Sequence, residues 1–494
     1  MENYTAPVVL SRRSRQGIVL GLDGWSSLTL FFAIAIGVAA TLRFGPIGLV
    51  ASVPVTLPLA FLALVRLGGM PGPKMAALWL AKQVRHGTGG TKNLFRPERP
   101  QLAGTLNMPG VRGNVQVWAI NGMAAAYNPA DRSVSITAEL EVDGFLMMDS
   151  RERYELSRKW STVLASFTQR EGFKRITMQE RTVPTGIEGA REFFDQATGI
   201  HHSDYTSQVV SNYRAVMDGS EHFAVAHRNY LTLTLDLGKL SGQVKSFGGG
   251  RDGVLALAQV EATNVTAALR DADLQVRRWL GVRQWAAMSR TAFDPGYLLL
   301  SERRMGNASG VDLAAIGPMA LEEPRGRNDI VRSDSGVHTT LWIHEWPRSA
   351  APVGFIEPLV FARNPVTGEV VTHILTVVLT PVSITAAMKR IREEKRVWRG
   401  NQRMKARRNE HDNAEDRADW VALEAQEESI VQGHGEFRYG AYLTVSARTD
   451  EELEASVAGM RNALSRAGME SQILYCQQAE ALMVNALPLG LGMN

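Results

Sequence analysis

Two long apolar runs stand back to back near the start of the chain, and they constrain its fold more than any other feature. Between Trp25 and Leu42 the only polar side chains are hydroxyls, and residues 47–65 include no charged side chain. Each run approaches the ~20 residues that an α-helix needs to cross ~30 Å of hydrocarbon. The Gly45-Pro46 pair between them favours a tight turn. The sequence therefore predicts a two-helix transmembrane hairpin over residues 21–66.

Two other interpretations compete with the hairpin. A secretory signal peptide has one apolar region of about 7–15 residues and a small-residue cleavage site, whereas this chain has two longer runs in succession. A buried hairpin in a soluble protein is the other, but charge-free runs of this length are typical of membrane helices. The mean hydropathy of −0.11 excludes a polytopic transporter and is compatible with a soluble body on a small anchor.

Basic residues flank the pair of runs on both sides and predict its orientation. Those before the first run are Arg12, Arg13 and Arg15, those after the second are Arg66, Lys74, Lys82 and Arg85, and Arg43 lies in the connecting turn. The positive-inside rule places both ends in the cytoplasm. We therefore expect a basic cytoplasmic tail over residues 1–20, an anchor in the plasma (inner) membrane, and a cytoplasmic body. One cysteine excludes an internal disulfide and fits a reducing compartment.

The body from residue 67 onward has a composition that can bury a core. Of the 494 residues, 45% are apolar and 21% are charged, which leaves room for about three folded units at ~150 residues each. Residues 67–112 are basic and punctuated by Pro and Gly, which predicts a juxtamembrane linker. Within it, residues 75–84 suit a short amphipathic helix on the bilayer surface. Residues 87–92 lack the spacing of a phosphate-binding loop.

Residues 113–330 predict a first α+β domain. Alternating apolar and polar residues favour an antiparallel meander, with expected strands at 115–120, 124–128 and 133–142. Further strands are expected at 175–183 and 230–235, and helices at 151–170, 187–217, 254–280 and 283–291. Residues 296–330 have few periodic features and are expected to form a loop.

Residues 331–494 predict a second α+β domain. Strands are expected at 337–346, 370–379, 437–445 and 471–475, with a helix at 451–466. The β-α-β order after residue 436 favours a ferredoxin-like unit. The predicted fold class is an α+β cytoplasmic body, made of an antiparallel meander plus a ferredoxin-like unit. The transmembrane hairpin anchors it, and a long charged helical arm projects from it.

The charged arm, residues 384–431, contains no proline and one glycine, and its charges are segregated. The basic residues of its first half are Lys389, Arg390, Arg392, Lys395, Arg396, Arg399, Arg403, Lys405, Arg407 and Arg408. They are candidates for contact with a partner protein, a nucleic-acid backbone or anionic lipid headgroups. The second half is mainly acidic. In the other interpretation the arm is solvated and folds back near residues 409–413, so that the charges of its two halves neutralise each other. The acidic half would oppose nucleic-acid binding.

No sequence pattern indicates catalysis. The chain lacks a Walker A motif and a G-x-S-x-G motif. His201 and His202 are adjacent and lack an H-E-x-x-H context, while His338 and His344 would lie about 20 Å apart along one strand. We therefore expect no enzymatic activity, no cofactor and no metal site.

Several motifs occur in an order that resembles a known family. They are Trp160 and Phe167 after the meander, the segments 230–236, 290–295 and 342–348, and the segments 477–481 and 487–490. With the basic N-terminus and two membrane helices, this set is similar to actinobacterial PrgI-like membrane proteins of conjugative elements. Those proteins resemble a type IV secretion inner-membrane subunit fused to the N-terminal, non-ATPase region of VirB-type conjugation ATPases.

The resemblance implies a membrane-anchored scaffold subunit in a multi-subunit transfer complex. It would dock a separate P-loop ATPase and other channel subunits, because this chain ends about where the nucleotide-binding domain of a conjugation ATPase would begin. A membrane-tethered protein that binds single-stranded DNA through the arm is the alternative, and a membrane-tethered enzyme is a third and weaker one.

Overall fold

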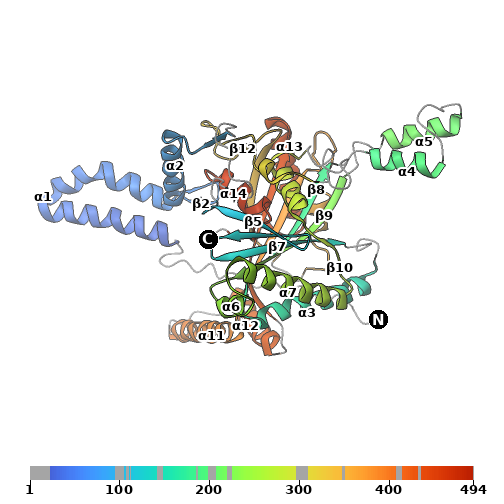
Figure 1. Cartoon of the computed structure of the whole chain (residues 1–494). Coiled ribbons are helices and arrows are strands. Elements are labelled where there is room, and N and C mark those ends of the chain that lie inside the picture. Colours follow the sequence, from blue (N-terminus) through green and yellow to red (C-terminus); the bar gives the residue numbers. More distant parts are fainter. Residues whose placement is uncertain are drawn as a thin grey trace.

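The computed structural model describes residues 23–94, 105–106, 111, 113–141, 148–184, 187–198, 207–219, 225–295, 310–347, 351–407, 414–431 and 435–492. The expected basic tail lies outside these ranges. The described chain is an α+β protein in which helices pack on a large antiparallel sheet and one apolar helical segment projects from it (Figure 1). This agrees with the predicted α+β class.

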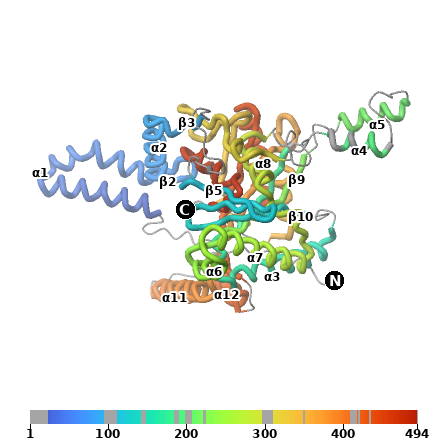
Figure 2. Tube along the Cα trace, viewed as in Figure 1, coloured from blue at the N-terminus to red at the C-terminus, as the bar shows by residue number. Residues whose placement is uncertain are grey.

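The projecting segment is α1 (Gly24–Leu64), which begins after Asp23, whose carboxylate accepts a hydrogen bond from the backbone N–H of Trp25. It is the one helix in the described ranges that is long and apolar enough to cross a membrane. Its backbone leaves the helical region at Gly45, where φ is +61°, a value that glycine adopts without steric cost. The parts before and after this residue lie side by side in both views (Figures 1 and 2).

The stretch predicted as a juxtamembrane linker contains ordered structure. Its first elements are β1 (Arg66–Leu67), β2 (Met70–Pro71), α2 (Gly72–Gly87) and β3 (Lys92–Leu94). The strands β1 and β2 pair with each other, while β3 pairs with a strand at the edge of the main sheet. The apolar segment α1 is therefore joined to the body by folded elements.

The main sheet has 14 strands, and all its pairings are antiparallel. Besides β3 they are β4 (Thr105–Leu106), β5 (Val115–Ile120), β6 (Met123–Asn128), β7 (Ser133–Glu141), β8 (Phe173–Pro184), β9 (Val225–Asp236), β10 (Gln275–Trp279), β11 (Ala320–Glu322), β12 (Val331–Arg332), β13 (Val337–Glu345), β14 (His373–Val382), β15 (Glu436–Ala447) and β16 (Glu470–Ile473). The meander expected from the alternation of apolar residues is confirmed as β5, β6 and β7.

The sheet is built from two similar halves. The helices involved are α3 (Ser150–Gln169), α7 (Gly250–Asp271), α10 (Glu357–Val360) and α13 (Asp450–Arg466). In chain order the halves are β7-α3-β8-β9-α7-β10 and β13-α10-β14-β15-α13-β16, and in space the strands run β10-β7-β9-β8 and β16-β13-β15-β14. The halves meet where β8 pairs with β14, so one continuous sheet spans both predicted domain ranges.

Helices cover both faces of this sheet. On one face, α3 and α7 pack through Phe167 and Leu257, and α13 packs through Met460. On the other face, α8 (Val282–Phe293) and α14 (Gln478–Ala486) contribute the fully buried Trp285 and Leu482. Each fully buried large apolar side chain contributes roughly 1.5–3 kcal/mol of transfer free energy.

A helical hairpin interrupts each half at the same place. Between β8 and β9 lie α4 (Glu188–Thr198) and α5 (Gln208–Gly219), and between β14 and β15 lie α11 (Ile384–Arg407) and α12 (Ala414–Val431). Figure 1 shows the two hairpins projecting from different ends of the body. The single helix expected at 187–217 is thus two helices in the described residues.

Candidate functional site

The charged arm folds back on itself. The rings of Trp398 on α11 and Trp420 on α12 lie 4.4 Å apart, and the ammonium group of Lys395 sits 5.3 Å from the ring of Trp420. Ala387, Ile391 and Ile430 form a small buried cluster at the base of the arm. The arm is therefore a helical hairpin with its own apolar contacts, as one of the two interpretations of its sequence expected.

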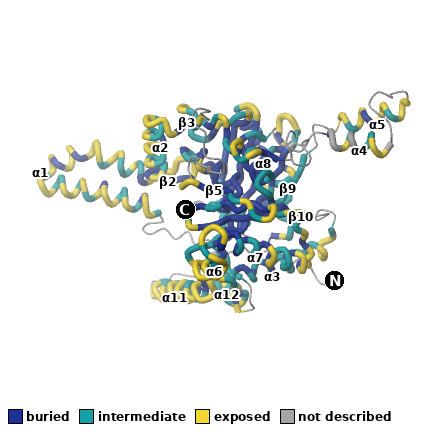
Figure 3. The backbone as a smooth tube through the Cα atoms, viewed as in Figure 1, coloured by how far each residue is buried: buried dark blue, intermediate teal, exposed yellow. Residues whose placement is uncertain are grey.

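Six of the predicted basic residues form one exposed stripe along α11. They are Lys389, Arg392, Arg396, Arg399, Arg403 and Arg407. Their spacing of three or four residues places them on one side of the helix. At 1.5 Å per residue the stripe extends over about 27 Å. Figure 3 shows that α11 lies at the surface of the body.

The other predicted basic residues are placed differently. Arg390 forms an ion pair of 2.7 Å with Glu436 at the start of β15, and Lys395 forms one with Glu427 of α12. Lys405 is half-buried, and Arg408 lies outside the described residues. The neutralisation expected between the two halves of the arm therefore involves Lys395. Of the stripe residues, Arg399 also faces α12, with its guanidinium 5.6 Å from the ring centre of Trp420.

A second candidate site is the connection between the membrane-type helix and the body. Lys82 of α2 is 1% exposed, and its ammonium group donates to the carbonyl oxygens of Pro324 and Arg327 and to Oδ1 of Asn328. Burial lowers the pKa of Lys82, and the carboxylate of Glu323 opposes that shift. A buried ammonium is tolerated when oxygen acceptors replace its water.

Arg85, one turn further along α2, strengthens the same connection. Its guanidinium forms a 3.0 Å ion pair with Glu323 and donates to the carbonyl oxygen of Cys476 at 2.6 Å. Glu323 is 3% exposed and also accepts from the backbone N–H of Ala479, at the start of α14. We name Lys82, Arg85 and Glu323 the anchor clamp, because together they fix α2 to the sheet body.

A group of ionisable residues lies where β8 meets β14. The carboxylate of Glu180 is 3.2 Å from Nε2 of His373 and 3.2 Å from Nδ1 of His227, and it accepts from the hydroxyl of Thr182. Burial is the largest single effect and favours the neutral acid, but the charge of His373 and the hydrogen bonds from His227, His373 and Thr182 together outweigh it and lower the pKa of Glu180 to about 2. Although burial acts to lower the pKa of His373, Glu180 raises it overall.

The neighbouring Arg181 points to the opposite sheet face and is 3% exposed. Its guanidinium donates to the carbonyl oxygens of Met288 in α8 and of Ala486, the last residue of α14. Helix C-terminal carbonyls favour a nearby cation. Burial lowers the pKa of Arg181 to about 10, so it stays charged at neutral pH.

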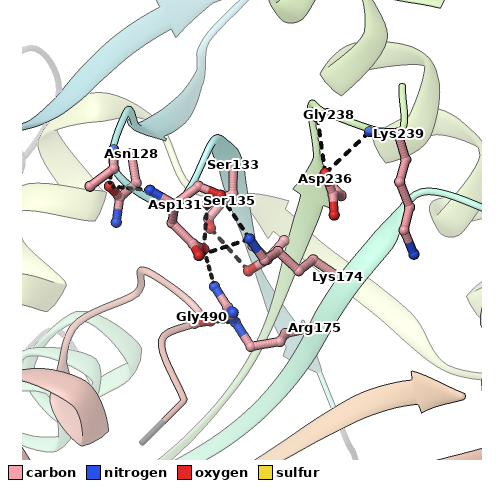
Figure 4. Close-up of polar contacts among 12 residues, drawn as sticks. Asn128, Asp131, Ser133, Ser135, Lys174, Arg175, Asp236, Gly238, Lys239 and Gly490 are labelled. Atoms are coloured by element: carbon pink, nitrogen blue, oxygen red, sulfur yellow. Dashed lines mark hydrogen bonds and ion pairs between the residues drawn. The ribbon is translucent and has the colours of Figure 1, made fainter. Parts of the chain in front are cut away.

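The segment after α14 lies across three strands of the sheet. The guanidinium of Arg175 donates to the carbonyl oxygen of Gly490 and pairs with Asp131, which also accepts from Lys174 at 2.8 Å (Figure 4). A Cβ on Gly490 would lie 2.0 Å from the hydroxyl oxygen of Thr234. This close approach requires glycine and holds the C-terminal segment on the sheet.

The two histidines that the sequence placed on one strand have separate surroundings. His338 is buried between the hydroxyls of Ser333 at 2.6 Å and Ser446 at 2.8 Å, and burial lowers its pKa to about 4. His344 shares a surface group with Glu345 and Glu470 whose ligand atoms lie within 4.8 Å of one another. Of the described residues, this is the group that could hold a metal ion.

Sequence reasoning identified the exposed charges and missed the buried ones. Lys82 stands in an otherwise apolar run, which is the one local signal that it has a specific partner. In the alternating pattern of its strand, Arg181 falls on the side opposite the apolar residues, which predicts exposure to solvent. In the structure α14 covers that position. The backbone carbonyl partners of Lys82 and Arg181 lie more than 100 residues away in the chain, so no local pattern indicates them.

These features define an α+β protein that carries a membrane-type helix and an exposed basic stripe. No family model matches the chain, and no curated protein matches it.

Proposed function

We propose that this protein is a membrane-anchored scaffold subunit of a conjugative, type IV secretion-like transfer apparatus. It docks a separate motor ATPase at the cytoplasmic face of the plasma membrane. In this proposal the two parts of α1 each cross the bilayer, and both ends of the chain are cytoplasmic. The observation that carries the proposal is the anchor clamp, because it fixes α2, the helix that follows the apolar α1, to a body that exposes a charged arm. The resemblance described from the sequence supplies the type of apparatus.

The strand order of the two halves supports a ferredoxin-like architecture for each of them. A β-α-β-β-α-β chain with an antiparallel sheet is the pattern of that fold, and both halves have this element order. In this proposal each helical hairpin is an insertion between the second and third strands of a ferredoxin-like unit. Such insertions leave the sheet intact while they present a separate surface to a partner.

We predict that reversing the charge of the basic stripe weakens capture of the motor ATPase. The variant Arg396→Glu, Arg403→Glu, Arg407→Glu replaces three exposed cations, and we expect at least a tenfold loss of a P-loop ATPase encoded nearby that co-purifies with the full chain. Mutation of charges at an interface rim changes association and its salt dependence. The measurement is quantitative pull-down from membranes, with membrane insertion monitored in parallel.

A matched control uses exposed arginines elsewhere on the body. Arg448→Glu with Arg461→Glu changes the charge on the surface around α13, where both side chains are exposed. We expect this variant to retain full capture. Equal capture by the stripe variant and the control would show that the arm is not the docking surface.

A second candidate function is binding of single-stranded DNA, and the geometry of the stripe favours it specifically. Six cations spread along about 27 Å of one helix face can contact successive phosphates of an extended strand. We expect log K to fall linearly with log salt concentration, with a slope near −0.7 for each phosphate contacted. Reversal of Arg403 and Arg407 should reduce that slope by about 1 to 2.

Fluorescence anisotropy of a labelled oligonucleotide, titrated with full-length protein in detergent between about 50 and 200 mM salt, measures this slope. Binding that is absent, or that does not respond to salt, would eliminate the DNA-binding function. It would leave the scaffold proposal unaffected.

A further inference from the structure

Helix α2 has the reverse of the polarity that a helix on a water-soluble body shows. Its polar side chains Lys82 and Arg85 point into the protein, where carbonyl oxygens and Glu323 bind them. Its exposed side carries Ala77, Leu80, Ala81 and Val84. Leu80 is 60% exposed and Val84 is 59% exposed. A surface helix in water normally places its apolar stripe toward the core and its charges outward.

This outer face, defined by Ala77, Leu80, Ala81 and Val84, adjoins the apolar surface of α1. The backbone N–H of Gly72 donates to the carbonyl oxygen of Val65 at 2.9 Å, so α2 begins where α1 ends. A Cβ at Gly72 would lie 2.2 Å from the carbonyl oxygen of Leu62, which shows how closely the two helices meet. Figures 1 and 2 show α2 standing across the end of α1. The last turns of α1 expose Phe61 and Leu64 by more than 60%.

We propose that the outer face of α2 lies in the interfacial layer of a phospholipid bilayer, with the helix axis along the membrane plane. This inference rests on the proposed membrane crossing of α1, whose end sets the level of the bilayer surface. An amphipathic helix in that position buries its apolar face at the boundary between headgroups and acyl chains. The anchor clamp then holds the sheet body at a fixed orientation to the membrane.

The residues at the rim of this surface fit lipid headgroups. Arg66 and Lys74 are exposed at the junction of α1 and α2, where they can meet the phosphates of anionic lipids. A phospholipid bilayer accounts for both kinds of group, because its acyl chains suit the apolar outer face and its phosphates suit the two basic residues.

Site-specific labelling of the full chain tests this placement. Cys476 is 1% exposed, so a cysteine introduced as Leu80→Cys or Val84→Cys can be labelled selectively with an environment-sensitive fluorophore. The protein is reconstituted into vesicles of phosphatidylcholine and phosphatidylglycerol that carry nitroxide-labelled lipids. We expect a nitroxide near the headgroup to quench labels at positions 80 and 84 at least twice as strongly as aqueous iodide does.

Two reference positions make the outcome specific. Val366→Cys, at a position that is 81% exposed on the body, should respond to iodide and not to lipid nitroxides. Val38→Cys, within α1 and 53% exposed, should respond to a nitroxide deep in the acyl chains.

Labels at 80 and 84 that behave like the label at 366 would overturn the placement of α2, provided that the label at 38 still responds to lipid. A label at 38 that responds to iodide would instead overturn the membrane crossing of α1, on which the proposed function rests. Labels at 80 and 84 that neither reagent quenches would show that a protein partner covers the face, and that result also contradicts the lipid placement.

Discussion

Replacing Arg181 by methionine is expected to lower the free energy of unfolding by about 2–6 kcal/mol. The guanidinium is buried and donates to the carbonyl oxygens of Met288 in α8 and of Ala486 at the end of α14, and also to Oε1 of Gln179. Methionine has a similar length but cannot donate, so the carbonyl oxygen of Ala486 and Oε1 of Gln179 lose this donor inside the core, while the carbonyl oxygen of Met288 keeps the hydroxyl of Thr291. Each unsatisfied buried acceptor costs roughly 1–3 kcal/mol. Urea unfolding of the full chain in detergent, followed by tryptophan fluorescence, measures the change.

A matched substitution at the surface separates this effect from the loss of a positive charge. Arg461→Met replaces an exposed arginine on α13, and we expect a change within about 0.5 kcal/mol. Arg181→Lys keeps the charge but cannot reach several acceptors at once, so its effect should fall between the two. A variant Arg181→Met as stable as the Arg461→Met control would mean that the two helix ends do not depend on this side chain.

The elements that the sequence predicted well are those whose own residues bury a regular face. Alternation over residues 115–142 predicted three strands because the chain alternates in side-chain polarity and has Asn-Gly and Asn-Pro turns between the strands. The helix at 451–466 was predicted for the same reason, since Leu453, Val457, Met460 and Leu464 repeat at helical spacing and all lie in the core. In these segments the local pattern and the tertiary contacts require the same structure.

The prediction of a single helix over residues 254–280 is wrong. The helix α7 ends at Asp271, the backbone turns at Asp273 with φ of +57°, and residues 275–279 pair with β7 as strand β10. The apolar residues Val276 and Trp279 are compatible with either period over so short a segment. What decides the outcome is the free edge of β7, which lies more than 130 residues earlier in the chain and leaves no local sequence signal.

The two candidate sites also differ in whether the local sequence could predict them. The exposed stripe on α11 could be read from the sequence, because a helix with basic residues at intervals of three and four has one charged side whatever it packs against. The anchor clamp could not be predicted from the sequence. Lys82 contacts residues 324–328 because the pairing of β3 with β11 brings these distant segments together at the edge of the sheet. Long-range sheet pairing therefore creates the clamp, while the stripe depends on local helical geometry alone.

The same dependence on long-range pairing holds for Glu180 and His373, which meet only because β8 and β14 join the two halves of the sheet. The carboxylate has a pKa lowered from 4.5 to about 2. It therefore contributes stability above pH 4.5, and that contribution is lost as the pH falls toward 2. The imidazole of His373 has a raised pKa, so its contribution is complete below pH 6.5 and is lost as the pH rises through the raised value. The pair should stabilise the join most between about pH 4.5 and 6.5.

We expect Glu180→Gln to lower the free energy of unfolding by roughly 3 kcal/mol at pH 5.5, as a pKa shift of this size implies. The loss should shrink toward pH 3, because the carboxylate is then protonated in the unfolded chain and still ionised in the native one, and also at alkaline pH, where His373 becomes neutral. Urea midpoints at several pH values for the wild type, Glu180→Gln, His373→Gln and the double variant form a cycle that isolates the pair. A coupling energy that stays constant from pH 3 to 9 would show that the two groups do not stabilise the join as an ion pair. In that case the backbone hydrogen bonds between β8 and β14 would account for the stability of the join, and the protein would lack this pH-dependent contact between its halves.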